Sequence, residues 1–290
     1  MKTQIFKGLF ISTLILGLAS CENERTDVKE QQINLEMTQE MTNNGETDLG
    51  NAFYGKSSKS DCHFEYEGPS GPEFWADLCG EDWKDCAGNS QSPIDINTRR
   101  ILEDGNINNI NTNYTISTTK ILNNGHTLQF DYTPGSYADL NNIDYDLLQF
   151  HFHTGSEHTI NGYRYPMEMH LVHRNNKTGF LGVVGIFFAE GRRDNRFLNQ
   201  FINELPEHEG EYYISNKEYH IKDALPEDMD FYTYSGSLTT PDCSEIVTWY
   251  VVKQPVYASR AQLKRFEEIM HKNFRPTQKL NNRVVRSKED

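Results

Sequence analysis

Half of the chain's ten histidines fall within the segment Gln149–His173, which opens with His151-Phe152-His153. In a β-strand, residues i and i+2 point to the same face and lie about 6.6 Å apart. Two imidazoles at that separation can converge on one metal ion, because zinc–nitrogen bonds are about 2.0 Å long. A strand at this position would therefore offer two metal ligands from one face.

A third candidate ligand, His170, lies in a second run with alternating character, Pro166–His173. If the two runs pair, Glu168, His170 and Val172 share a face, and three imidazoles could surround one metal. Three protein nitrogens with an open fourth position are typical of catalytic rather than structural zinc sites. The other two histidines of the segment are out of phase with this face, so we interpret them as structural, hydrogen-bonded residues: His158 and His173.

A cupin-type metal site is an alternative, in which His151, His153 and Glu157 would be the ligands. Cupin motifs carry glycines on either side of these ligands. Tyr145 and Arg164 occupy the corresponding positions of this chain, so the sequence disfavours the cupin interpretation.

Several segments resemble the α-class carbonic anhydrases, in the order that this family has them. Ser156–Ile160, Tyr165 and Glu168–Val172 are similar to the family signature, and Gln149–His153 is similar to the strand before it. The other matching segments are Asn89–Ile96 (NSQSPIDI), Leu122–His126 (LNNGH), Tyr234–Pro241 (YSGSLTTP) and Val247–Trp249 (VTW). The resemblance covers the chain from about residue 62 to its end.

The resemblance implies a Zn²⁺ ion held by His151, His153 and His170. Ring orientation would come from partners beside these ligands. Gln149 would accept the ring proton of His151, Glu168 that of His170, and a backbone carbonyl near Asn273 that of His153.

The resemblance also implies the reaction, which is the reversible hydration of carbon dioxide to bicarbonate and a proton by zinc-bound hydroxide. Thr239 would orient the hydroxide and donate a hydrogen bond to Glu157, and His126 would be the proton shuttle. Tyr66 and Asn124 would order water between the zinc and His126. The substrate pocket would be formed by Val172, Val183, Leu238, Thr240, Val247 and Trp249.

A second hypothesis is a catalytically silent binding module on the same fold. Such relatives usually lack one of the zinc histidines. This chain keeps His151, His153 and His170 together with Glu157 and Thr239. The sequence therefore favours an enzyme.

The elements that must position these residues are mostly short strands separated by turn clusters. Strands are predicted at 114–118, 127–132, 146–153, 166–173, 179–189, 211–213 and 245–252. Helices are predicted at Asp194–Asn203, with Asp194 as its cap, and at Ser259–Asn273, capped by Ser259. This pattern predicts a mainly β, mostly antiparallel domain, and the resemblance implies one large twisted central sheet with peripheral helices.

The N-terminal region differs in character from the remainder of the chain. Residues 1–20 combine two lysines with an apolar run, Leu9–Ala19, which is too short to span a bilayer. The ending Leu-Ala-Ser-Cys is similar to a bacterial lipoprotein signal, with Cys21 as the lipidated residue. Residues 21–60 are polar and predict a flexible acidic tether, which leaves 61–290 as the carbonic anhydrase-like domain.

These features predict an exported protein of the bacterial cell envelope, anchored by lipid and either periplasmic or on the cell surface. The formal net charge of −14 argues against nucleic acid or an anionic membrane surface as a partner. The predicted partner is the small substrate pair, carbon dioxide and bicarbonate. Monomer and dimer both remain open.

Four cysteines follow Cys21, and an even number in an exported protein favours disulfides, with three possible connectivities. They are Cys62, Cys79, Cys86 and Cys243. The resemblance to bacterial members of the family implies a Cys86–Cys243 bridge, which leaves Cys62 and Cys79 as the second pair.

Overall fold

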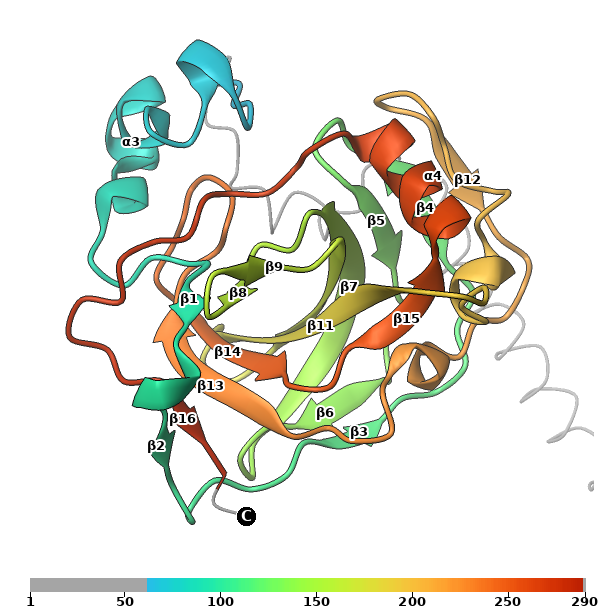
Figure 1. Ribbon diagram of the computed structural model, residues 1–290. Helices are drawn as coiled ribbons and strands as arrows, with labels where there is room; N and C mark the ends of the chain where they lie inside the picture. The colour runs from blue at the N-terminus through green and yellow to red at the C-terminus, as the bar shows by residue number, and fades with distance from the viewer. Residues whose placement is uncertain (1–61, 289–290) are drawn as a thin grey trace, which may run out of the picture. The chain divides into compact units, whose positions relative to one another are not determined.

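A computed structural model describes residues 62–288 of the chain (Figure 1). The predicted signal segment, Cys21 and the predicted tether lie outside the described residues. Among residues 62–288, no helix combines the length and apolar character needed to cross a membrane.

The strands form two sheets. The small sheet contains β1 (Asp95–Ile96), β8 (Thr159–Ile160) and β9 (Tyr163–Arg164). The large sheet contains thirteen strands: β2 (Leu102–Glu103), β3 (Asn111–Asn113), β4 (Lys120–Asn123), β5 (Leu128–Asp131), β6 (Tyr137–Asp139), β7 (Asp144–Thr154), β10 (Met167–Arg174), β11 (Leu181–Gly191), β12 (Tyr212–Ile214), β13 (Phe231–Gly236), β14 (Val247–Val252), β15 (Val256–Ser259) and β16 (Arg286–Ser287).

The large sheet is mixed but mostly antiparallel, with the strand order β12-β4-β5-β7-β10-β11-β14-β13-β16-β2. Parallel pairing occurs between β11 and both β14 and β15, and between β16 and β2. Figure 1 shows these strands crossing the domain, with helix α4 (Arg260–Met270) at the periphery. The predicted fold class, a mainly β domain with a large and mostly antiparallel sheet, is confirmed.

Alternation along β7 separates the core from the histidines. Phe150 and Phe152 are fully buried in the main hydrophobic cluster, where Phe152 packs 4.8 Å from the ring of Phe266 on α4. His151 and His153 therefore point to the opposite face, because successive strand residues alternate. Burial of the phenylalanines fixes which face of β7 carries the imidazoles.

Helix α4 confirms the prediction for the C-terminal helix. Ser259 caps it through a capping box with Gln262, as its position before the apolar periodicity indicated. The helix ends at Met270, before the predicted end, because His271 has a left-handed φ of 54°. The chain then turns so that the Asn273 side chain donates a hydrogen bond to the Phe152 carbonyl of β7.

The predicted helix at Asp194–Asn203 is wrong, because only the short 3₁₀ helix η5 (Leu198–Gln200) forms there. The Asn195 side chain accepts hydrogen bonds from the backbone amides of Phe197 and Leu198. Such local side-chain bonds compete with a helical ladder. Gln262 of α4 also binds the Asn195 backbone, which holds the segment in this shape.

The strand prediction at 114–118 is also wrong, since only Ser117 forms an isolated bridge, with Tyr219. Ten strands were not predicted as strands: β1, β2, β3, β4, β6, β8, β9, β13, β15 and β16. The remaining helices are short: η1 (Gly68–Ser70), α3 (Trp75–Leu78), η2 (Gly80–Asp82), η3 (Lys84–Ala87), η4 (Thr98–Arg100) and η6 (Ile221–Ala224).

Two disulfides join the predicted cysteine pairs, Cys62–Cys79 and Cys86–Cys243. The Cys86–Cys243 bridge ties the segment before β1 to the loop between β13 and β14. Gln91 supports the same connection by donating from Nε2 to the Cys243 carbonyl at 3.1 Å.

Removing either disulfide should destabilise the fold, and removing the longer one should do so more. The bridges join residues 17 and 157 positions apart. In the chain-entropy model, the entropy that a disulfide removes from the unfolded chain grows with the logarithm of that separation. The expected losses in unfolding free energy are about 3 kcal/mol for C62S/C79S and about 5 kcal/mol for C86S/C243S. Urea unfolding of both double variants measures them. A larger loss in C62S/C79S would contradict this account.

Candidate metal centre

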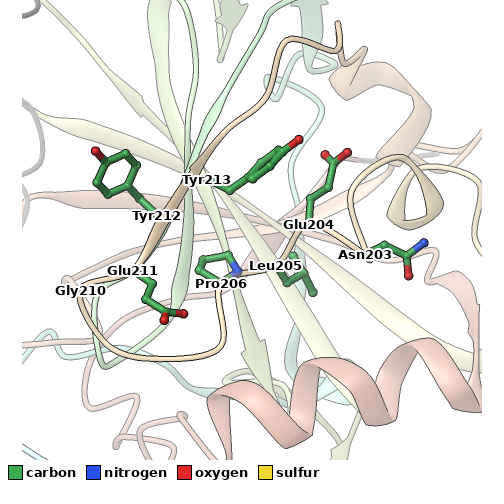
Figure 2. A pocket seen from close by; sticks show the side chains of 8 residues that line it. All are labelled: Asn203, Glu204, Leu205, Pro206, Gly210, Glu211, Tyr212 and Tyr213. Atoms are coloured by element: carbon green, nitrogen blue, oxygen red, sulfur yellow. The ribbon is translucent and has the colours of Figure 1, made fainter.

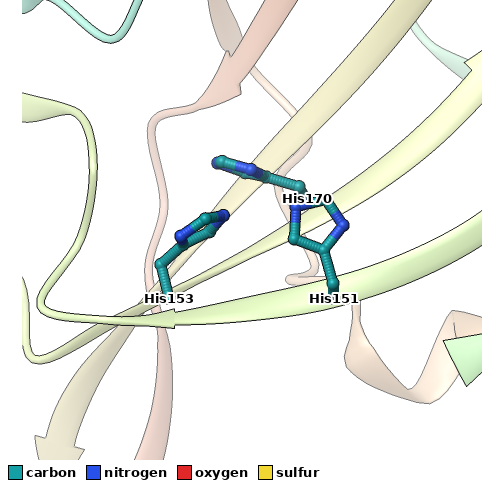
Figure 3. Close-up of side chains that lie close together, drawn as sticks. All are labelled: His151, His153 and His170. Carbon is teal, nitrogen blue, oxygen red and sulfur yellow. The ribbon is translucent and has the colours of Figure 1, made fainter. Parts of the chain in front are cut away.

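The antiparallel pairing of β7 with β10 brings the three predicted ligands together. His151 lies directly opposite His170, and His153 follows two residues further along β7. Figure 3 shows the three side chains gathered on one side of the strands. One ring nitrogen from each histidine lies within 4.8 Å of the others, which suits ligands of a single metal ion.

Each ring is fixed by an acceptor on its other nitrogen. His151 Nδ1 lies 2.9 Å from Gln149 Oε1, His170 Nε2 lies 2.9 Å from Glu168 Oε1, and His153 Nδ1 lies 2.7 Å from the Asn273 carbonyl. A carbonyl or carboxylate oxygen only accepts, so these nitrogens carry the protons. The opposite nitrogens, which are His151 Nε2, His153 Nε2 and His170 Nδ1, are left with lone pairs.

One nitrogen of the His153 ring indicates whether the site suits a metal ion. Its Nε2 atom is buried and has no hydrogen-bond partner among residues 62–288. A buried acceptor without a partner is costly unless something else satisfies it. Three neutral imidazole nitrogens are a donor set that suits zinc, so the residues present fit a zinc ion.

The electrostatics keep two of the imidazoles neutral. Burial lowers the pKa of His151 well below its ordinary value, and the His153 and His170 rings lower it further. Burial also lowers the pKa of His153, although Glu157 opposes that shift. Both rings therefore stay unprotonated at neutral pH, which is the form that binds a metal.

Glu168 accepts hydrogen bonds from two of the histidines. Its Oε1 atom lies 2.8 Å from His158 Nδ1 as well as 2.9 Å from His170 Nε2, and its Oε2 accepts from the His158 amide. Burial alone would raise the pKa of Glu168, but His158 and His170 hold it well below the ordinary value. These hydrogen bonds explain why His158, Glu168 and His170 cluster without a second metal.

His158 and His173 are hydrogen-bonded structural residues, as interpreted from the sequence. His158 Nε2 lies 2.7 Å from the Tyr234 hydroxyl, which donates to Ser92 Oγ. His173 Nε2 lies 2.8 Å from the Tyr114 hydroxyl. Their partners lie far away in the sequence, and no spacing pattern could have identified them.

Gly185 makes room for the Glu168 carboxylate. It lies opposite His170 in the β10–β11 register, and a Cβ atom there would meet Glu168 Oε1 at 2.8 Å. A larger residue would displace the carboxylate that orients His170. This requirement was missed in the sequence, where glycine within a strand was the only signal.

Glu157 is fully buried beside the three histidines. Its Oε1 accepts from the Arg275 amide at 2.8 Å, and its Oε2 lies 3.5 Å from His153 Nε2 and 4.0 Å from His170 Nδ1. Glu157 belongs to neither group of described residues whose donor atoms could hold a metal. The cupin alternative, in which Glu157 is a ligand, is not supported.

The hydrogen bond implied between Thr239 and Glu157 is not formed in the structure. Thr239 is buried, but Glu157 Oε2 has no hydrogen-bond partner in the part of the chain that the structure describes. The Thr239 side chain has no hydrogen bond to Glu157 within residues 62–288. The structure thus brings Glu157 to the histidines, with its Oε2 atom 3.5 Å from His153 Nε2.

An apolar wall lies on the same sheet face as the histidines. Val172 pairs with Val183, which pairs with Trp249, so their side chains stand side by side across β10, β11 and β14. The Trp249 ring lies 4.8 Å from the His170 ring. Val247 is also buried on this face, whereas Leu238 and Thr240 in the adjoining loop are partly exposed.

His126 follows the Asn124-Gly125 turn and contacts an N-terminal arm, Cys62–Tyr66. Its ring stacks on Phe64 at a centroid distance of 3.8 Å, with Tyr66 6.5 Å away. Asn124 shapes the turn, because its Oδ1 accepts from the amides of His126 and Thr127. The His126 ring is therefore stacked on Phe64 and lies beside the arm.

Burial lowers the pKa of His126, and the nearby His63 lowers it further, while Glu65 and Glu209 act in the opposite direction. Asn273 connects this residue to the triad. Its side chain donates to the His126 carbonyl, and its own carbonyl accepts from His153.

A surface pocket of about 530 Å³ lies at β12, apart from the triad (Figure 2). None of the predicted site residues lines it. The lining residues are Asn203, Glu204, Leu205, Pro206, Gly210, Glu211, Tyr212 and Tyr213.

Comparison with known proteins gives a consistent result. The family model described as eukaryotic-type carbonic anhydrase matches residues 70–289. A carbonic anhydrase of Nostoc sp. is 41% identical over 224 residues, covering 76% of this chain and 84% of that protein. A carbonic anhydrase of Klebsiella pneumoniae is 40% identical over 227 residues, covering 77% of this chain and 90% of that protein.

Among solved structures, the α-carbonic anhydrase of Thermovibrio ammonificans, in complex with the inhibitor sulfanilamide, superimposes with a TM-score of 0.75. It is 39% identical, and the match covers 78% of this chain and all of that chain. The family match spans most of the chain and includes the segments that carry the histidines. The chain therefore belongs to the eukaryotic-type, or α, carbonic anhydrase family.

Proposed function

We propose that this protein is a zinc-dependent enzyme that catalyses the reversible hydration of carbon dioxide to bicarbonate and a proton. Family membership supports the reaction. The observation that carries the proposal is the convergence of three oriented imidazoles, with the buried Nε2 of His153 lacking a partner. A catalytically silent module would not need these three ligands.

His151, His153 and His170 would hold the zinc ion through the nitrogens opposite their hydrogen-bonded ones. Bound zinc supplies a Lewis acid that lowers the pKa of water, and carbonic anhydrases are the reference example of this effect. Neutral ligands leave the charge of the ion undiminished. Gln149, Glu168 and the Asn273 carbonyl hold the rings in the orientation that this requires.

The protein supplies a substrate position as well as a metal site. Carbon dioxide is uncharged and linear, and it suits the apolar wall of Val172, Val183 and Trp249 beside His170. Glu157 is positioned to accept a hydrogen bond at its unpartnered Oε2 atom, and the Thr239 hydroxyl is the proposed donor. That contact would align Thr239 toward the reacting water.

The reaction releases a proton that must leave a buried site, and His126 is the proposed carrier. Imidazole is suited to this role because its pKa lies near neutrality. Its neutral ring accepts the proton, which then passes to solvent or buffer. Tyr66, which lies near the His126 ring, is proposed to order water on the path.

The proposed location follows from the N-terminal sequence. We propose that the chain is exported, is cleaved before Cys21, and is anchored to a membrane of the bacterial cell envelope by lipid on that cysteine. Support comes from the short apolar run that ends in Leu-Ala-Ser-Cys.

Each of the substitutions H151A, H153A and H170A should abolish stoichiometric zinc binding and carbon dioxide hydration. Each change removes one of three ligands. Metal analysis of the purified variants and a stopped-flow hydration assay measure both effects. H208A, at an exposed histidine outside the site, is the matched control and should retain one zinc per chain. Full zinc occupancy in H170A would contradict the ligand assignment.

Substitution H126A should lower kcat several-fold and leave kcat/KM nearly unchanged, and added imidazole should restore the rate. The wild-type kcat should fall with decreasing pH as His126 becomes protonated, because a protonated ring cannot accept another proton. Since burial lowers the pKa of His126, that fall should occur below about pH 6.5. Unchanged kcat in H126A would exclude His126 as the shuttle.

Substitution C21S should release the protein from the membrane fraction, because the thiol that carries the lipid is lost. Fractionation and immunoblotting of cells that express the full chain measure this. T26S, in the predicted tether, is the matched control and should stay membrane-bound. Continued membrane partitioning of C21S would rule out lipidation at that residue.

A further inference from the structure

The arm Cys62–Tyr66 fixes the surroundings of His126. Phe64 stacks on the His126 ring with an interplanar angle of 13°, and the buried Trp75 supports Phe64 from 5.2 Å away. The Cys62–Cys79 disulfide ties the start of the arm to the residue that follows α3. A ring held in this way has little freedom to swing toward bulk solvent.

The arm also presents an ionisable pair next to the held ring. The His63 ring lies 5.9 Å from the His126 ring, centroid to centroid. His63 Nε2 lies 2.6 Å from Glu65 Oε1, and both side chains are more than half exposed, at 61% and 57%. An exposed histidine with a carboxylate partner thus lies beside His126.

The hydrogen bond to Glu65 determines which nitrogen of His63 can accept a proton. An ionised carboxylate only accepts hydrogen bonds, so His63 Nε2 carries the proton of the neutral ring. The lone pair is then on Nδ1.

We infer that the His63–Glu65 pair is a second proton carrier, which receives the proton from His126 and releases it to solvent. This inference rests on the proposed shuttle role of His126. In the step, an N–H bond of protonated His126 breaks and an N–H bond forms at His63 Nδ1. One bridging water can carry the proton, since two hydrogen bonds of about 2.8 Å span such a gap. No electrons are exchanged.

Burial of His126 favours this transfer, although two neighbouring carboxylates oppose it. The groups that face it are His63, Glu65 and Glu209, whose carboxylate packs against Gly125. Burial disfavours the protonated form of His126, whereas His63 is exposed to water. Burial of His126 therefore favours passing its proton outward to the exposed His63.

Kinetics of two variants test the inference. H63Q and E65Q should lower kcat for carbon dioxide hydration several-fold in weak buffer and leave kcat/KM unchanged, and added imidazole should restore the rate. E67Q removes the same charge from the exposed acidic residue that directly follows the arm and should behave as wild type. Wild-type kcat in H63Q would overturn the inference.

The H126A variant separates this inference from the proposed function. If H126A lowers kcat but H63Q does not, the shuttle role of His126 is supported and the role inferred for His63 is wrong. If H126A leaves kcat unchanged, the shuttle role fails, and the inference fails with it.

Nuclear magnetic resonance titration of the His126 ring gives a readout that does not depend on turnover. Because His63 lowers the pKa of His126, its removal should raise that pKa in H63Q relative to wild type, and E67Q should leave it unchanged. An identical His126 titration in H63Q and wild type would show that the two rings are not coupled, which contradicts the inference.

Discussion

The pairing of His151 opposite His170 across β7 and β10 is the constraint on which the site depends. A slip of one residue in this register would turn every side chain of one strand to the other face. Phe150 and Phe152 oppose such a slip, because it would move two buried rings out of the core. Hydrophobic burial on one face therefore fixes the histidines on the other.

A network of buried hydrogen bonds fixes the orientation of the histidine rings. Glu168 bonds to both His158 and His170, and Asn273 bonds to His126, Phe152 and His153. Buried polar groups are costly unless they have partners, and nearly all of these do. Among the described residues, the exceptions at the site are His153 Nε2 and Glu157 Oε2, which lie 3.5 Å apart.

The sequence predicted the parts of the site that follow from strand alternation and from recognisable motifs. The three ligands, Gln149 and Glu168 share one face because of the period of a strand. It could not predict the roles of Tyr234, Ser92 or Gly185, which depend on contacts between segments far apart in the chain. It also failed at Asp194–Asn203, where the Asn195 side chain replaces a helical ladder with local hydrogen bonds. The stacking of Phe64 on His126 could not be predicted from the sequence either, because no sequence pattern links the two segments.

Removal and return of the metal tests the central claim most directly. Carbon dioxide hydration would be followed by stopped flow on the purified protein, on the chelated apoprotein, and after titration with zinc. The account predicts that chelation abolishes activity and that activity returns in proportion to zinc, reaching its plateau at one ion per chain. Hydration at the original rate in protein shown to be free of metal would contradict it.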